Sequence, residues 1–175
     1  MNKRIIFMAL LMLAAGRAVA GGENVKFSGT LVALPCTIPD SDRAIRVPMG
    51  TINAHDLYLH QAMPRIPFIL HLQDCDTRIA GRVSVTFSGA EDAVLPGYLA
   101  IDDGLPGASG IAIGLEGAGG AQIKVNQATA SYALLSGNNE LGFQAFIAGE
   151  PEAVKERSIQ TGNFSAAAVL EVSYE

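Results

Sequence analysis

The chain has 175 residues, a formal net charge of −5, three histidines and no tryptophan. This length is sufficient for one domain with its own hydrophobic core. The acidic balance argues against a nucleic-acid partner, which would need a basic stripe, and against adsorption to an anionic membrane surface.

The first twenty residues have the pattern of a secretory signal peptide. Lys3 and Arg4 form a basic start, and Ala18-Val19-Ala20 is a small-residue cleavage site. The apolar stretch between them, Ile5–Ala15, is about eleven residues long and too short to span a bilayer. Cleavage would remove three basic residues and no acid, so the formal charge of the mature chain would become −8.

An alternating segment follows the cleavage site. Val25, Phe27, Gly29 and Leu31 fall on one face of an extended chain, with polar residues on the other. Gly29 is unusual there, because a glycine weakens a strand and often marks a close backbone approach or a shallow pocket. The segment is therefore either an ordinary first strand or a segment that docks elsewhere.

The chain has two cysteines, Cys36 and Cys75. In an exported protein, a lone pair of cysteines indicates a disulfide bond. A metal site is the alternative, but His71 is the one other ligand close in sequence. His55 and His60 are five residues apart, so they point in different directions on a helix or a strand. We expect no metal and no cofactor.

The middle of the chain predicts short strands separated by Gly and Pro turns. The clearest are Ile66–Leu72, Arg82–Ser88 and Leu141–Ile147. Shorter candidates are Ala44–Val47, Tyr98–Ile101, Gly110–Leu115, Gln122–Asn126 and Ala130–Leu135. Two polar stretches, Thr51–Ala62 and Gly149–Thr161, predict loops or a single helical turn. Many short strands without a long amphipathic helix predict an all-β sandwich.

The last stretch, Gly162–Glu175, alternates strictly. One face carries Phe164, Ala166, Ala168, Leu170, Val172 and Tyr174. Alternation over this length predicts a half-buried β-strand. A terminal strand usually frays unless another backbone pairs with it. The pattern therefore raises the question of which segment covers this strand.

No catalytic constellation is evident. The chain has no G-x-S-x-G motif, and the glycines from Gly117 to Gly120 lack the G-K-[ST] ending of a nucleotide-binding loop. Asp74 and Asp76 have no evident acid–base partner. We therefore expect a protein that is not an enzyme and has no small-molecule substrate. A secreted carbohydrate-binding adhesive module is the alternative that a β-sandwich permits, although the lack of tryptophan disfavours it.

Taken in order, these segments resemble the pilins of the bacterial chaperone–usher pathway. The resemblance rests on the signal peptide, V-K-F-S-G at Val25–Gly29, P-C-T at Pro35–Thr37, Q-D-C-D-T at Gln73–Thr77, Gly162 followed by Phe164, and the penultimate Tyr174. It covers essentially the whole mature chain. The stretch Phe87–Leu99 also resembles the K-type adaptor pilins of P-pilus tips.

The resemblance implies an incomplete immunoglobulin-like sandwich that lacks its last strand. A donor strand from another subunit or from a chaperone would complete it. The implied parts are a signal peptide at 1–20, a donor-strand extension at 21–34 that runs into the first strand, and a pilin domain at 35–175. The implied donor face is Val25, Phe27, Gly29 and Leu31. The implied receiving edge is Gly162, Phe164, Ala166, Ala168, Leu170, Val172 and Tyr174, with the carboxylate of Glu175 as a chaperone contact. Cys36 and Cys75 match the family disulfide.

The resemblance also implies the partners and the location. The partners would be a periplasmic chaperone, an outer-membrane usher and neighbouring pilins, with no nucleic acid among them. The protein would pass through the periplasm to the cell-surface fimbrium and serve there as a non-catalytic structural subunit of an adhesive pilus. Because only Gly21–Asn24 would precede the donor face after cleavage, the sequence favours a minor or adaptor subunit.

Overall fold

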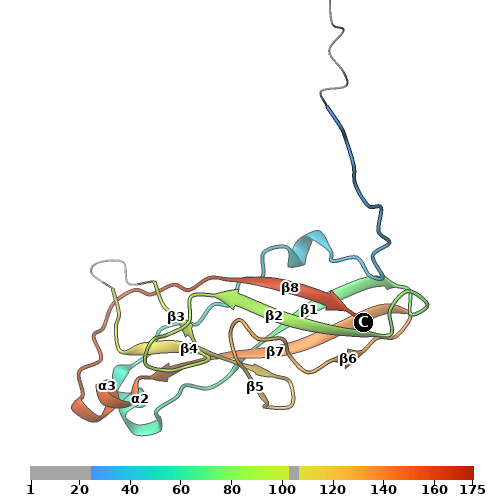
Figure 1. Cartoon of the computed structure of the whole chain (residues 1–175). Coiled ribbons are helices and arrows are strands. Elements are labelled where there is room, and N and C mark those ends of the chain that lie inside the picture. Colours follow the sequence, from blue (N-terminus) through green and yellow to red (C-terminus); the bar gives the residue numbers. More distant parts are fainter. Residues whose placement is uncertain (1–24, 103–106) are drawn as a thin grey trace, which may run out of the picture. The chain divides into compact units, whose positions relative to one another are not determined.

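The computed structural model describes residues 25–102 and 107–175 (Figure 1). The predicted signal peptide and residues 21–24 lie outside the described residues. The chain divides into two units, Met1–Val32 and Ala33–Glu175. Among the residues that the structure describes, no helix is long and apolar enough to cross a membrane.

Residues 33–175 form two antiparallel sheets, so the predicted all-β class is confirmed (Figure 1). The larger sheet has the order β1-β7-β4-β3, with β5 also paired to β4. The smaller sheet has the order β6-β2-β8. The bounds are β1 Ile66–Cys75, β2 Arg82–Gly89, β3 Leu99–Ala100, β4 Ile111–Gly117, β5 Gln122–Ile123, β6 Tyr132–Ala133, β7 Gly137–Gly149 and β8 Ala168–Tyr174.

Strand β7 is the centre of the larger sheet, because it pairs with β1 on one side and with β4 on the other. It contains the predicted strand Leu141–Ile147, and its residues Phe143 and Ile147 are almost completely buried. On the opposite face, the ring of Phe146 covers Gly114 of β4, where a Cβ would overlap the ring. The C-terminal half of β7 is therefore buried on both faces.

Aromatic side chains join the two sheets. The ring centroid of Phe87 on β2 lies 5.2 Å from that of Phe143 on β7 and 6.1 Å from that of Phe68 on β1, in both cases edge to face. Such edge-to-face pairs are favourable beyond the apolar area that they bury. The core of the sandwich is therefore a packed contact between β2 and the β1–β7 pair.

The described part of the chain has three short helices: η2 (Asp40–Asp42) and α2 (Ala54–His60) precede β1, and α3 (Pro151–Glu156) lies between β7 and β8. The side chain of Asn53 accepts a hydrogen bond from the main-chain N–H of His55 at 3.0 Å and begins α2. Leu57 is 2 % exposed and fixes α2 to the core. α2 and α3 lie within the stretches that the sequence predicted as loops or a single helical turn.

Three predicted boundaries need correction. Residues 25–34 form no strand, so the interpretation of Val25–Leu31 as an ordinary first strand is wrong, and the extension does not run into one. Ala44–Val47 forms no strand either, and the terminal strand begins at Ala168 rather than at Gly162. Alternation shows which faces an extended chain would present, but a strand also needs a continuous hydrogen-bonded neighbour. The first two segments have no such neighbour in the described part of the chain, and residues 162–167 make only isolated bridges, to residues 107 and 102.

Candidate strand-binding groove

Strand β8 has one paired edge and one free edge within the described part of the chain. It pairs antiparallel with β2 from Val83↔Tyr174 to Gly89↔Ala168, and it ends the smaller sheet. The main-chain groups along a free edge are available to pair with an additional strand. Figure 1 shows β8 beside β2, with the segment that contains η2 along its other side.

An open groove of about 1550 Å³ lies along this free edge. Its floor is the core between the sheets and includes Phe68, Leu70, Phe87, Leu99, Ile111, Ile113, Leu115 and Ala145. One wall is the stretch 159–174, which ends in β8, and the other is the stretch 42–52. The apolar interior of the sandwich is therefore open to solvent between two lengths of chain.

The first wall has the predicted alternation. Five residues are half-buried and pack against the core: Phe164, Ala166, Leu170, Val172 and Tyr174. Ala168 also lines the groove but is exposed, and Val169, between it and Leu170, is 65 % exposed. Burial raises the pKa of Tyr174. The predicted inward face of the terminal strand thus lies along the groove.

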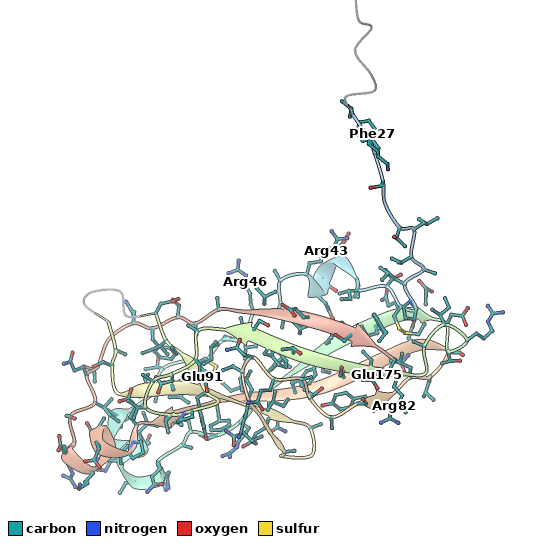
Figure 2. All side chains as sticks on the ribbon, viewed as in Figure 1. Phe27, Arg43, Arg46, Arg82, Glu91 and Glu175 are labelled. Atoms are coloured by element: carbon teal, nitrogen blue, oxygen red, sulfur yellow. A yellow bond between two sulfur atoms is a disulfide. The ribbon has the colours of Figure 1, made fainter. Side chains whose placement is uncertain are left out.

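We call residues 42–52 the second wall. Four of its side chains, Ile45, Val47, Met49 and Ile52, are half-buried and pack against the core. Residues 44–52 make no main-chain hydrogen bond to any residue in the described part of the chain. Figure 2 shows Arg43 and Arg46 on this wall, both directed away from the sheets. The second wall therefore presents apolar side chains to the core and an unpaired backbone to the groove.

Sequence reasoning missed the second wall as part of the site. It predicted a short strand at Ala44–Val47 and ended it at Pro48. The available signal was that the alternation continues through Pro48 to Met49, although no ladder forms. Proline cannot donate to a ladder, but it does not prevent the side chains on either side of it from sharing one face.

Gly162 lies at the end of the groove where the first wall meets residues 107–109. A Cβ on Gly162 would come 2.7 Å from the main-chain nitrogen of Ala108, so only glycine fits without displacement. The N–H of Ala108 donates to the carbonyl of Asn163 at 3.0 Å, and the N–H of Asp102 donates to the carbonyl of Ser165 at 2.7 Å. These bonds hold the first wall in place before β8 begins.

Glu175 closes the other end of the first wall. Its main-chain oxygen accepts hydrogen bonds from the N–H groups of Gly81 at 2.9 Å and Arg82 at 3.0 Å. Its side chain accepts a bond from Ser131 Oγ at 3.1 Å and is exposed, as Figure 2 shows near Arg82. The terminal residue is therefore fixed in position, and its contact with a chaperone stays a prediction.

The two cysteines fix the beginning of the chain that becomes the second wall. Cys36 and Cys75 form a disulfide bond, and each is 5 % exposed. Next to it, Thr37 and Gln73 exchange two main-chain hydrogen bonds of 2.7 Å. Because both sulfur atoms are bonded to each other, the metal alternative that paired them with His71 is wrong.

His71 instead contacts Asp42. Asp42 Oδ2 accepts a hydrogen bond from the main-chain N–H of His71 at 2.7 Å and lies 2.8 Å from His71 Nδ1. Burial would raise the pKa of Asp42, but the hydrogen bonds from His71 and Ser41 outweigh burial and hold that pKa below its usual value. Asp42 is therefore a carboxylate at the start of the second wall.

The residues of the predicted donor face lie in the other unit of the chain. Val25, Phe27 and Leu31 have exposed side chains, and Phe27 is 91 % exposed (Figure 2). A Cβ on Gly29 would meet no atom within 4 Å. Exposed large apolar residues on an unpaired segment indicate a surface that another molecule covers. Their role as a donor face stays a prediction.

Several known proteins are similar to this chain over most of its length. A family model described as "Fimbrial protein" matches residues 25–175. The fimbrial adapter PapK of Escherichia coli is 31 % identical over 167 residues, which cover 93 % of this chain and 92 % of PapK. The major MR/P fimbria protein of Proteus mirabilis is 33 % identical over 180 residues, which cover 100 % of this chain and 99 % of that protein.

Solved structures agree on the fold. The crystal structure of the P pilus rod subunit PapA is similar with a TM-score of 0.70 and 20 % sequence identity. The match covers 81 % of this chain and 100 % of that one. At this level of identity the similarity concerns the arrangement of the strands.

Proposed function

We propose that the groove receives a β-strand from another molecule. The proposal starts from the family: the chain belongs to the fimbrial protein family and is a structural subunit of a chaperone–usher pilus. The protein is exported through the periplasm to the cell surface, and its partners are the periplasmic chaperone, the usher and neighbouring pilins. These partners would bind at the groove, through the residues named below.

The observation that carries the proposal is the open groove along the free edge of β8. An inserted strand would pair with the backbone of β8 and place alternate side chains over the core. Full burial of a Val, Leu or Phe side chain contributes about 1.5–3 kcal/mol, so three such residues would contribute several kcal/mol. The ordering of both segments opposes part of this gain.

Residues 21–34 are the segment that this chain would donate to its neighbour. Val25, Phe27, Gly29 and Leu31 have the spacing that places them on one face of an added strand. Gly29 would leave space for a neighbouring side chain at the third position. The chain would thus act as acceptor through residues 162–175 and as donor through residues 21–34, and residues 35–175 would form the pilin domain.

We place the protein as a minor or adaptor subunit of an adhesive pilus. Support comes from the short donor extension, because four residues would precede Val25 after cleavage. The similarity to a major fimbria protein is of the same size as that to PapK, so sequence identity does not discriminate between the two roles. Immunogold labelling would discriminate: a label confined to fibre tips supports an adaptor, and a label along the shaft contradicts it.

Two other functions are less well supported. The family and the fold are those of structural pilins, so we propose no catalytic role. A carbohydrate-binding adhesive module is not favoured, because the fimbrial match spans residues 25–175 and the floor of the open groove consists of apolar core side chains. The apolar lining suits a strand better than a sugar.

Deletion of residues 21–29 tests the assignment of the two ends. The deleted chain should still co-purify with its chaperone, because the acceptor groove is intact, but it should not insert into the groove of the next subunit. Phe27→Ala should weaken insertion, whereas Ser28→Ala, one position along and on the other face, should not. Loss of chaperone binding on deletion would show that the donor and acceptor ends are wrongly assigned.

A further inference from the structure

The second wall of the groove is held at few points. Before it, the Thr37–Gln73 bridge joins the chain to the free edge of β1 with two main-chain hydrogen bonds. After it, buried Leu57 fixes α2 to the core. Between these points, residues 44–52 make no main-chain hydrogen bond in the described part of the chain. Apart from the side chains that pack against the core, the position of the wall therefore depends on residues 37–42, where the chain passes along the edge of β1.

Asp42 lies at that point. Main-chain groups of Gln73 face the free edge of β1, and those of His71, two residues earlier, face the same way. At Gln73 a neighbouring backbone satisfies these groups, whereas at His71 the Asp42 carboxylate accepts the N–H. At His71, a side-chain carboxylate thus replaces the main-chain acceptor that a continuing β-ladder would supply. After Asp42 the chain turns away from β1 and forms the second wall.

We propose that Asp42 is a positioning residue that fixes the second wall and so sets how long an inserted strand stays bound. This inference rests on the proposed function of the groove. Oδ2 receives the two contacts from His71, Oδ1 accepts a bond from Ser41 Oγ at 2.8 Å, and the side chain is 8 % exposed. Hydrogen bonds to a carboxylate are stronger than those to a neutral acceptor, and a nearly buried one is poorly replaced by water.

The test measures the half-life of a bound strand. The chain is purified with its chaperone and loaded with a panel of synthetic N-terminal pilin peptides, residues 21–34 of this chain among them. Dissociation is then followed by fluorescence. Asp42→Ala should shorten the half-life about tenfold or more, because it removes hydrogen bonds to a charged group. Asp42→Asn keeps an acceptor and should give an intermediate value.

Asp40→Ala is the matched control. Asp40 lies in the same short helix, its side chain is 89 % exposed, and it pairs with Arg43. Its removal should leave the half-life unchanged.

Two outcomes separate this inference from the proposed function. The inference is overturned if the wild-type chain exchanges peptides and the Asp42 variants release them at the wild-type rate. Asp42 would then not set the lifetime of the bound strand, and a lower melting temperature of the variants would not change this conclusion. If the wild-type chain takes up no peptide of the panel and cannot be separated from its chaperone by any of them, the proposed groove function fails instead.

Discussion

The backbone of Gly162 lies directly against that of Gly107, so that a Cβ added to Gly162 would come 2.6 Å from the Gly107 carbonyl carbon. The contact is between main-chain atoms, which cannot move aside as a flexible side chain can. It closes one end of the groove and fixes the first wall where that wall turns toward β8.

Gly162→Ala should therefore destabilise the strand-complemented subunit by about 1–3 kcal/mol, the usual cost of overpacking. The added methyl group would push the first wall away from residues 107–108 and break the hydrogen bond from Ala108 to Asn163. Chemical denaturation of the chaperone complex measures this effect. Gly119→Ala is the control, because a Cβ there meets no atom within 4 Å and should cost little.

Leu170 and Val169 are neighbours on β8 with opposite environments. Leu170 packs against the core from the groove side, whereas Val169 is 65 % exposed. Leu170→Ala should weaken strand binding by about 1–2 kcal/mol, less than the 2–5 kcal/mol typical of a fully buried leucine. Val169→Ala should change it by less than about 0.5 kcal/mol. A larger loss for Val169→Ala than for Leu170→Ala in a peptide-binding titration would show that the predicted faces are reversed, and equal losses would contradict the assignment of either face.

The alternation of β8 could be predicted because a period of two directly encodes one buried and one exposed face. Its starting residue could not, because Asn163 and Ser165 pair with residues 107 and 102 through long-range bridges that leave no local pattern. The disulfide could be predicted from two cysteines in an exported chain. The sequence does not encode which edge remains open, because that depends on the order of the strands in the sheet.

The second wall shows a different limit. Ile45, Val47 and Met49 alternate as they would in a strand, yet the segment has no ladder partner in the described part of the chain. Its contact through Asp42 and His71 joins residues 29 positions apart in sequence. Neither residue type nor spacing marks such a pair, so only the folded chain reveals it.

Replacement of both cysteines by serine should lower the stability of the complex by roughly 3–4 kcal/mol in the loop-entropy account, because the bond closes a long loop between positions 36 and 75. It should also loosen the start of the second wall, beside the Thr37–Gln73 bridge. Thermal melting measures the first effect, and hydrogen exchange at the Thr37 and Gln73 amides measures the second. Unchanged exchange there would contradict a role for the disulfide in the wall.

The Arg65–Glu116 pair should make the free energy of unfolding decrease as the pH falls into the acid range. Arg65 donates two hydrogen bonds to Glu116, at 2.9 and 3.1 Å, and these hold the pKa of Glu116 below its usual value of 4.5. Because the pKa is lower in the folded state, the pair stabilises the fold above about pH 4.5 and loses this contribution as the pH falls through the folded-state value.

Glu116→Gln should therefore reduce the stability of the complex near neutral pH and flatten its decline below about pH 4.5. Urea denaturation at a series of pH values measures both effects. Glu156→Gln, an exposed position at the end of α3, is the control and should preserve the wild-type profile. A Glu116→Gln curve parallel to that of the wild type would contradict the coupling.

Calorimetric melting of the purified mature chain, with and without an inserted strand, tests the central claim most directly. The open groove predicts that the chain alone aggregates or melts without a cooperative transition, and that a bound strand peptide or the chaperone restores one cooperative transition. A chain that stays monomeric in solution without any partner and melts cooperatively at the same temperature as the complex would show that it closes the sandwich with its own residues.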